Sequence, residues 1–489
     1  MATFLFGFTW ALTAIAVVLN VFIYFYPDFN EQPSHCKWYA AGTGDSPSLL
    51  NTIVTDLSSK ILNNPLSTPA DLFSPSVLHD SGDVKDIRML TFGDPQINGN
   101  WPSTKYIKRL DNYGNDYYLG HIYSVMKKRM QPSHVAVMGD LFSSQWIYDS
   151  EFYNRTYRYV TRLFPRPEAY KQVALDTFNK HENYDWENWM NEENAMDPEK
   201  RFRSRVYSDV YDWTNLTAKY PLPSGPDVRE PLFINLTGNH DIGYSGDATW
   251  QHMARFHLLF GQNNYVINYN KGTPYEWRLV VLDSLTLEGP ALQEEFVKFT
   301  WSFLENLKEK ENPGFKGSTV LLTHIPFYKP EGLCTDGPQH IYYVDNEKEP
   351  YKNGKLRSQN HLSYDVSQKV LDIIFPNPDK EGIVLTGHDH EGCDNYYTKD
   401  GESKEWKAVS KVESKKGVVR EIVVRSMMGD FNGNTGIMTG VFNKESSNWE
   451  FHFTLCPFVV QHWWWVTKIV TGLTVVLQSL CYLKRNISI

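Results

Sequence analysis

Five short motifs rich in acidic, amide and imidazole side chains are spread along the chain, and each follows a run of apolar residues. The motifs are Gly93-Asp94, Gly139-Asp140, Gly238-Asn239-His240-Asp241, Thr323-His324 and Gly387-His388-Asp389-His390. Val135–Met138, for example, ends directly before Gly139, and Ile383–Thr386 ends directly before Gly387. Short apolar runs bounded by glycine are typical of buried strands. We therefore expect the motifs to lie on loops at one edge of a single core.

The side chains of these motifs predict a site for two divalent cations. The expected ligands of one cation are Asp94, Asp140 and His390, and those of the other are Asp140, Asn239, His324 and His388. Asp140 is the natural bridge because a carboxylate has two oxygens to share. Oxygen and nitrogen ligands without a thiolate favour Mn²⁺, Fe or Zn²⁺ over Ca²⁺. Two cations about 3.5–4 Å apart activate water and stabilise charge on phosphorus, so the motifs predict hydrolysis of a phosphate ester.

Three residues lie beside the expected ligands and have other expected roles. We expect His240 to protonate the departing alkoxide and Asp241 to orient its ring or adjust its basicity. Alternatively, His240 binds a phosphate oxygen. Gln96 lies two residues after Asp94, and its amide either coordinates a cation weakly or forms hydrogen bonds with the ligands.

Length and charge limit the class of protein. With 489 residues, the chain is long enough for one large α/β domain. Its net charge is -9 and it has no run of lysine or arginine, which argues against a nucleic-acid-binding surface. We therefore expect no nucleic-acid partner, and the sequence predicts no particular oligomeric state.

Two apolar segments lie near the ends of the chain and predict membrane spans. Phe4–Tyr26 has no charged side chain and is long enough to cross a hydrocarbon layer of about 30 Å, with a cleaved signal peptide as the alternative. Trp463–Leu483 contains one charge, Lys468, which can reach an interface, and a surface-lying amphipathic helix is its alternative. Lys484 and Arg485 follow directly, and the positive-inside rule places them in the cytosol. Both termini are then cytosolic, and the domain between the spans is not.

The expected organisation follows from these spans. It is a transmembrane helix at 1–26, a lumenal lead-in at 27–86, the metal-binding domain at 87–456 with a helical insertion at about 150–231, a second transmembrane helix at 457–483 and a cytosolic tail at 484–489. Glycosylation is predicted at the sequons of Asn154 and Asn215. The sequon of Asn235 runs into the motif that begins at Gly238, and we expect it to be buried and unused.

Four cysteines lie on the predicted oxidising side and allow three pairings. Cys334 follows the His324 loop and Cys393 follows His390, so we expect their loops to meet near the metals. Cys36 and Cys456 each lie just outside a span. The sequence thus favours the disulfides Cys334–Cys393 and Cys36–Cys456, with free buried thiols as the alternative.

Other elements are expected from their apolar patterns. Strands are predicted at Ile87–Phe92, Val135–Met138, Leu232–Leu236, Arg278–Asp283, Ser318–Thr323, Gly382–Thr386, Gly417–Arg425 and Gly440–Phe453. Helices are predicted at Leu49–Leu62, Tyr117–Met130, Ala291–Lys308 and Ser363–Ile374.

The motifs resemble those of the calcineurin-like metallophosphoesterases, whose pattern is D-x-H, G-D, G-N-H-[DE], H and G-H-x-H. Gln96 departs from the pattern because it replaces the first histidine. A closer resemblance covers most of residues 87–440 and is to the fungal ethanolamine phosphatases that remodel GPI anchors. The segments that carry it are Phe92–Ile97, Thr323–Tyr328, Gly387–His390 with Cys393, and Met427–Asp430.

This resemblance implies an α/β fold in which two mixed sheets flanked by helices form a four-layer sandwich between two transmembrane helices. It implies an endoplasmic reticulum membrane protein with a lumenal catalytic domain and two divalent ions, with Mn²⁺ favoured. It also implies removal of ethanolamine phosphate from a mannose of the GPI glycan, and the second mannose is favoured. The expected partners are the GPI glycolipid or GPI-anchored proteins, and the lipid bilayer.

Two other functions remain open at this point. One is a lumenal phospholipid or sphingolipid phosphodiesterase built on the same fold. The other is a catalytically silent factor for cargo trafficking. Gln96 is the one departure from the ligand pattern, so metal content would separate an enzyme from a silent factor.

Overall fold

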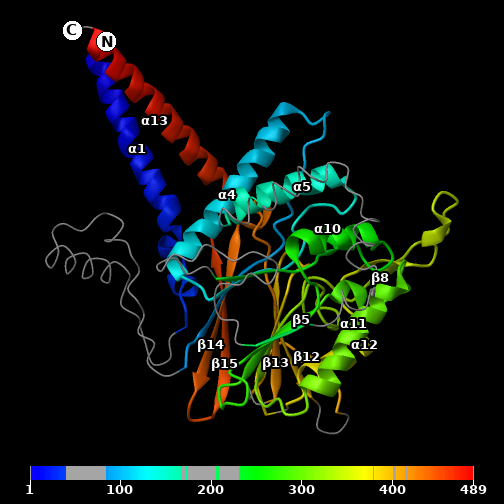
Figure 1. Cartoon of the computed structure of the whole chain (residues 1–489). Coiled ribbons are helices and arrows are strands. Elements are labelled where there is room, and N and C mark those ends of the chain that lie inside the picture. The colour runs from blue at the N-terminus through cyan, green and yellow to red at the C-terminus, as the bar shows by residue number, and fades with distance from the viewer. Residues whose placement is uncertain are drawn as a thin grey trace.

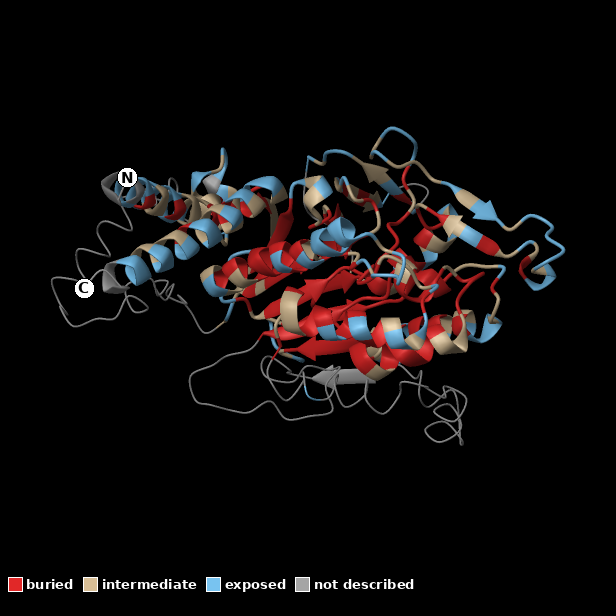
Figure 2. Cartoon of the chain, turned by 90° about the horizontal axis from the view of Figure 1, so that it is seen from above, coloured by how far each residue is buried: buried red, intermediate tan, exposed pale blue. Residues whose placement is uncertain are grey.

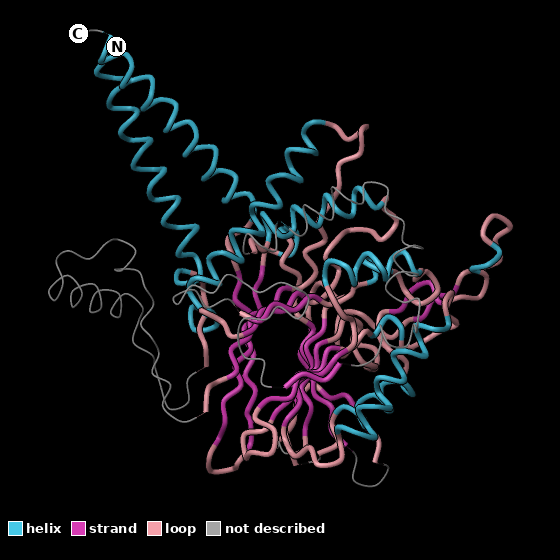
Figure 3. The backbone as a smooth tube through the Cα atoms, viewed as in Figure 1, coloured by secondary structure: helices cyan, strands magenta, loops and turns pink. Residues whose placement is uncertain are grey.

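The computed structural model of the chain describes residues 2–39, 84–166, 172, 205–208, 231–377, 379–399, 404–413 and 417–487. Two β-sheets lie at the centre of the domain, with helices outside them (Figure 1, Figure 3). The smaller sheet has the order β15-β14-β1-β2-β4 and consists of β1 (Ile87–Phe92), β2 (His134–Val137), β4 (Leu232–Asn235), β14 (Asn434–Asn443) and β15 (Asn448–Pro457). The fold is therefore the expected α/β sandwich of two mixed sheets.

The larger sheet has the order β12-β11-β13-β10-β7-β6-β5-β3. Its strands are β3 (Arg205–Ser208), β5 (Tyr265–Tyr269), β6 (Trp277–Val281), β7 (Ser318–Leu322), β10 (Gly382–Thr386), β11 (Cys393–Lys399), β12 (Trp406–Val409) and β13 (Val418–Val423). A separate two-stranded arm is formed by β8 (His340–Tyr342) and β9 (Leu356–Gln359). The main helices are α1 (Ala2–Phe29), α4 (Tyr106–Met130), α5 (Asp149–Arg158), α9 (Asn239–Ile242), α10 (Trp250–Phe260), α11 (Glu294–Asn306), α12 (Tyr364–Ile374) and α13 (Gln461–Ile487).

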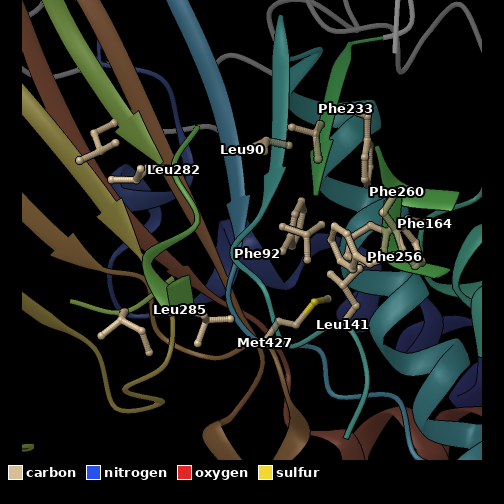
Figure 4. Close-up of a cluster of buried hydrophobic side chains, with 14 of the residues drawn as sticks. Leu90, Phe92, Leu141, Phe164, Phe233, Phe256, Phe260, Leu282, Leu285 and Met427 are labelled. Carbon is tan, nitrogen blue, oxygen red and sulfur yellow. The ribbon is translucent and has the colours of Figure 1, made fainter. Parts of the chain in front are cut away.

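Alternation along the strands divides the core into layers. In β1, Met89 belongs to one buried cluster, whereas Leu90 and Phe92 belong to another. Successive side chains of a strand point to opposite faces, so one cluster fills the space between the sheets and the other lies beneath the helices. Figure 4 shows part of the second cluster, in which Phe92 and Phe233 lie close to Phe164. Both faces of β1 are therefore buried, which explains its continuous apolar sequence.

The two apolar terminal helices pair outside the domain (Figure 1). Both α1 and α13 are long and apolar enough to cross a membrane, and most of their residues are not buried by the domain (Figure 2). Polar side chains link them, since the Asn20 amide donates to Thr471 Oγ1 at 2.8 Å and the Gln478 amide donates to Thr13 Oγ1 at 2.8 Å. Such bonds stabilise pairs of helices in lipid.

One of two disulfides and helix α4 attach the bases of these helices to the domain. The structure contains both expected disulfides, Cys36–Cys456 and Cys334–Cys393, with Cα–Cα distances of 4.8 and 5.7 Å. The first joins the chain after α1 to the end of β15. The Tyr118 hydroxyl of α4 donates to the carbonyl of Val459 at 2.9 Å, directly before α13. The two terminal helices are thus attached to the domain at the same place.

Three expected elements differ in the structure. The helix expected at Tyr117–Met130 begins at Tyr106 in the structure. The prediction was too short because the first turns of the helix are exposed and lack the apolar stripe of a buried helix. The single strand expected at Gly440–Phe453 is a hairpin of β14 and β15. Its turn forms because Asn443 Oδ1 accepts the backbone N–H groups of Glu445 and Ser446 at 2.9 and 3.2 Å. The helix expected at Leu49–Leu62 lies outside the described residues.

The expected insertion and sequons are described only in part. The insertion begins with α5 as a helix, but it also contributes strand β3 to the edge of the larger sheet. Asn154 is exposed on α5, although Thr156 of its sequon is buried. Asn235 is buried and accepts the Tyr159 hydroxyl at 2.6 Å, so that sequon is inaccessible as expected. Asn215 lies outside the described residues, and glycosylation at Asn154 and Asn215 stays a prediction.

A buried histidine at the start of β2 predicts acid sensitivity. His134 is fully buried between the Ser133 and Tyr269 hydroxyls, and burial lowers its pKa from 6.5 to about 4. Above pH 6.5 this histidine is neutral in both the folded and the unfolded chain, so it does not lower the free energy of unfolding. As the pH falls from 6.5 toward 4, the unfolded chain binds a proton that the folded chain does not bind. The free energy of unfolding then decreases by about 3 kcal/mol in total. We expect His134→Gln to show a smaller loss of unfolding free energy between pH 7 and 4.5 in denaturant titrations. Equal losses in both proteins would contradict a neutral folded histidine.

Candidate metal centre

The structure brings all the predicted ligands to one edge of the two sheets. They follow the carboxyl ends of five strands, with Asp94 after β1, Asp140 after β2, Asn239 after β4, His324 after β7, and His388 and His390 after β10. Ligand atoms of Asp94, Asp140 and His324 all lie within 4.8 Å of one another. Residues almost three hundred positions apart in the sequence therefore share one buried site.

Four acceptor atoms converge at the predicted second cation position. Asn239 Oδ1 lies 3.1 Å from His324 Nε2 and 3.0 Å from His388 Nδ1. His324 Nε2 also lies 3.5 Å from Asp140 Oδ1. Ligand atoms about 2.1 Å from a shared cation are separated from one another by roughly 3.0–3.4 Å. The spacing of these four atoms fits a single divalent ion.

Hydrogen bonds on the far side of each ring set the histidine tautomers. His324 Nδ1 lies 2.7 Å from the Met138 carbonyl, and His388 Nε2 lies 3.0 Å from the Gln359 carbonyl. A carbonyl oxygen only accepts, so these two ring nitrogens carry the protons. His324 Nε2 and His388 Nδ1 then present lone pairs toward the oxygen of Asn239. Lone pairs that face one another repel unless a cation lies between them, so this arrangement suits a bound metal ion.

The predicted first cation position includes Gln96. Gln96 Nε2 lies 3.0 Å from Asp140 Oδ2 and 3.2 Å from His390 Nε2. The amide thus contacts two expected ligands directly. With its nitrogen facing them, it acts as a hydrogen-bond donor, whereas rotation of the amide by half a turn would present its oxygen as a ligand. The amide forms hydrogen bonds with the expected ligands in this structure, and its role beside a bound cation stays a prediction.

Charge in the site also favours cations. Burial, followed by the Asp140 carboxylate, raises the pKa of Asp94 well above its usual value. Its two oxygens accept the backbone N–H of His388 at 3.3 and 3.1 Å. Burial lowers the pKa of His388 to about 3, so its ring stays neutral and able to bind a metal. Two adjacent buried carboxylates with neutral imidazoles are stabilised by divalent ions.

Backbone conformation at the site departs from the usual. Among the described residues, nine non-glycine residues have positive φ, and four of them belong to the site. These four are Asp94 (φ 38°), Gln96 (φ 41°), Asp140 (φ 47°) and His388 (φ 77°). Each such conformation costs about 1–3 kcal/mol and persists only where the surrounding structure enforces it. The strain therefore lies where the ligands must turn toward a common point.

His240 lies at the open side of the centre. Its backbone N–H donates to Asp140 Oδ1 at 2.8 Å, and its ring nitrogen Nε2 lies 3.8 Å from Asp140 Oδ2. The side chain is 38 % exposed, whereas the Asp140 side chain is 2 % exposed. The ring can therefore reach a bound substrate at the mouth of the site, and its protonating role stays a prediction.

Asp241 is held by backbone N–H groups from two loops. Its carboxylate accepts the backbone N–H groups of Leu141, Phe142 and Gly238 at 3.1, 3.1 and 2.9 Å. None of the hydrogen bonds described for this carboxylate reaches the His240 ring. The Asp241 carboxylate therefore links the loop that carries Asp140 to the loop that carries Asn239. Its role in orienting the His240 ring stays a prediction.

Sequence reasoning missed the groups that hold the His324 loop. The Glu421 carboxylate accepts the backbone N–H of Phe327 at 2.8 Å and pairs with Lys329 Nζ at 2.6 Å. Lys329 also donates to the Phe327 carbonyl at 3.0 Å, and both charged side chains are fully buried. A lysine two residues after Phe327 was the only available signal. No sequence signal marked the carbonyl groups of Met138 and Gln359, because every residue has a backbone carbonyl.

The chain is similar to several known proteins. The chain is 49 % identical over 483 residues to Protein TED1 of Saccharomyces cerevisiae, and the match covers 96 % of each protein. An uncharacterized protein of Schizosaccharomyces pombe is 25 % identical over 73 % of this chain and 70 % of its own length. Metallophosphoesterase 1 of Xenopus laevis is 26 % identical over 39 % of this chain and 51 % of its own length. No family model matches the chain.

The two kinds of similarity support different statements. The match to Protein TED1 covers nearly the whole of both proteins, at an identity that establishes common descent. The match to Metallophosphoesterase 1 is partial and more distant. The two mixed sheets, with the predicted ligands at their shared edge, are consistent with both similarities. The chain belongs to the family of Protein TED1, which has metallophosphoesterases among its more distant relatives.

Proposed function

We propose that this protein is a phosphodiesterase that uses two divalent metal ions to remove ethanolamine phosphate from the GPI-anchor glycan. The mannose we favour is the second. The reaction would take place during maturation of GPI-anchored proteins, before they leave the endoplasmic reticulum. The catalytic domain would face the lumen, with both termini in the cytosol and Mn²⁺ as the preferred metal.

One observation carries the metal-dependent part of this proposal. The lone pairs of His324 Nε2 and His388 Nδ1 converge with Asn239 Oδ1 and Asp140 Oδ1, which are all acceptors. The name of the Metallophosphoesterase 1 relatives supports a phosphate ester as the substrate. Two apolar helices and two disulfides support a membrane protein whose domain lies in an oxidising compartment.

The roles of the chain's own groups follow from their positions. Asp94, Asp140, His390 and, with its amide turned, Gln96 would hold one ion, and Asp140, Asn239, His324 and His388 the other. When bound, the ions supply activated water and neutralise charge on the phosphoryl oxygens. The exposed His240 ring would donate a proton to the departing sugar oxygen. Asp241 would keep the Asp140 and Asn239 loops in register.

The decisive measurement is mass spectrometry of GPI glycans from cells that lack the gene. We expect ethanolamine phosphate to be retained on the second mannose and to disappear when the wild-type gene is restored. Purified full-length protein loaded with Mn²⁺ should release ethanolamine phosphate from GPI glycolipid and leave sphingomyelin intact. Unaltered GPI glycans with sphingomyelin cleavage would instead favour a lipid phosphodiesterase. Protein that binds no metal would favour a silent trafficking factor.

A further inference from the structure

We propose that the first half of α4, with the loops before and beside it, is a membrane-contact surface that places the mouth of the metal centre against the lipid bilayer. The surface is formed by six exposed side chains, here called the aromatic rim. They are Trp101, Tyr106, Ile107, Leu110, Tyr113 and Trp146. The proposal does not depend on which phosphate ester is cleaved.

Strand direction places the metal centre on the membrane side of the domain. β14 pairs antiparallel with both β1 and β15, so β1 and β15 run in the same direction. Asp94 follows the end of β1, and α13 begins just after the end of β15. Cys36, which follows α1, is bonded to Cys456 near the same end of β15. The edge of the smaller sheet that carries the metal ligands is therefore the edge from which both apolar helices leave.

Helix α4 crosses the bases of the two apolar helices and then continues beyond them. The Gly114 backbone lies so close to the Trp465 ring of α13 that no Cβ would fit between them. His121 Nε2 lies 3.0 Å from the Ile23 carbonyl of α1. Figure 1 shows the first half of α4 extending past the sheets on the side from which α1 and α13 project. The rim is thus continuous with the membrane-spanning helices.

The side chains of the rim are of the kind found at membrane interfaces. Tyr106, Leu110 and Tyr113 follow one another at helical spacing, and Tyr106 and Ile107 are 80 and 81 % exposed. In water alone, so many large apolar side chains on one surface would be unfavourable. Tyrosine and tryptophan are enriched where a membrane meets water, and the nearby Lys105 suits lipid phosphates, whereas Lys108 is paired with Asp111 at 2.8 Å.

A rigid connection joins the rim to the metal ligands. The Asp116 carboxylate of α4 accepts two bonds from Arg158 of α5, both at 2.8 Å. Arg158 also donates to the Asn98 carbonyl at 2.8 Å, two residues after Gln96. The Asn112 amide of α4 donates to the Gly99 carbonyl at 3.0 Å. The position of α4 on a membrane would therefore set the position of the loop that follows Asp94 and Gln96.

A cavity lies between the rim and this loop. Its volume is about 350 Å³, and its lining includes Asn98 and Ser143, which follow Gln96 and Asp140 in the chain. Trp101 and Trp146 of the rim line it as well. The cavity thus lies beside the loops that carry two of the predicted ligands and opens among residues of the rim. The occupant of the rim is the interfacial region of a bilayer.

The test uses full-length protein reconstituted in phosphatidylcholine vesicles, with Cys481→Ser so that one added thiol can carry an environment-sensitive dye. Reporters are placed by Ile107→Cys and, separately, Leu110→Cys. The matched control is Val344→Cys, because Val344 is also apolar and is 79 % exposed. Val344 follows β8 on the arm that both Figure 1 and Figure 2 place far from α1 and α13. Unfolding midpoints of the labelled proteins verify that each is folded.

Lipids that carry a nitroxide near the headgroup report contact with the bilayer. We expect about a twofold or greater loss of dye fluorescence at positions 107 and 110, since interfacial helices insert about 5–10 Å. The label at position 344 should lose none. Quenching at 107 and 110 no greater than at 344 would overturn the proposal and would mean that another segment or a protein covers the rim. Because no substrate is involved, this result is independent of the proposed reaction.

Discussion

Replacing Asp140 with asparagine is expected to lower phosphodiester turnover by about a thousandfold or more. Asp140 contacts groups of both predicted cation positions, since Oδ2 lies 3.0 Å from Gln96 and Oδ1 lies 3.5 Å from His324. An amide has one acceptor oxygen and no charge, so it cannot bridge two ions. Metal analysis should show a fall from about two bound ions per chain to one or none. Turnover is measured with a soluble phosphodiester and Mn²⁺.

Asp247→Asn is a suitable control for this variant. The Asp247 carboxylate is also buried and accepts the Tyr343 hydroxyl, but no described contact joins it to a predicted ligand. We expect this protein to keep its metal and most of its turnover. Near-normal activity of Asp140→Asn would contradict the two-metal mechanism. Loss of metal in both variants would point to a general defect in folding.

Replacing Gly238 with alanine is expected to remove metal binding and turnover through the backbone alone. A Cβ at Gly238 would overlap the backbone nitrogen of Asp140 and its Oδ1 atom. The end of β4 and the loop that carries Asp140 cannot move apart easily, because the Asp241 carboxylate accepts hydrogen bonds from the backbone of both segments. We expect at least a hundredfold loss of turnover, comparable with removal of a catalytic group. Metal content and turnover are measured as for Asp140→Asn.

Gly337→Ala is the matched glycine control. A Cβ at Gly337 would meet only the flexible side chain of Glu331, at 3.3 Å. This substitution should leave metal content and turnover within about twofold of the wild type. Full metal occupancy in Gly238→Ala would show that the two loops can separate, which would contradict the close approach described here.

Local sequence determined the strands that end at the metal centre. β10 was predicted at Gly382–Thr386 with the bounds it has in the structure, because its apolar run is short and ends at Gly387. The identity of the ligands also followed from the sequence, since acidic, amide and imidazole groups are the natural ligands of divalent ions. The terminal helices were predicted by length and apolar content, although α1 continues to Phe29 and α13 begins at Gln461.

Elements without a distinctive local pattern were predicted less well. The first turns of α4 have exposed apolar and aromatic residues, so no buried stripe marked them as a helix. The turn between β14 and β15 depends on the side chain of Asn443 and on positive φ at Ser447. Such turns interrupt an otherwise uniform strand pattern, which is why one strand was expected where there are two.

The sequence by itself determined which groups are available to bind metal, and where each lies relative to a strand. Only the tertiary structure decided which atoms face each other. His388 presents Nδ1 to the centre because its Nε2 meets the carbonyl of Gln359, and Asp241 braces loops because three backbone N–H groups surround it. The physical reason is that strand and helix preferences belong to contiguous segments, whereas tautomers, braces and converging lone pairs depend on contacts between residues far apart in the chain.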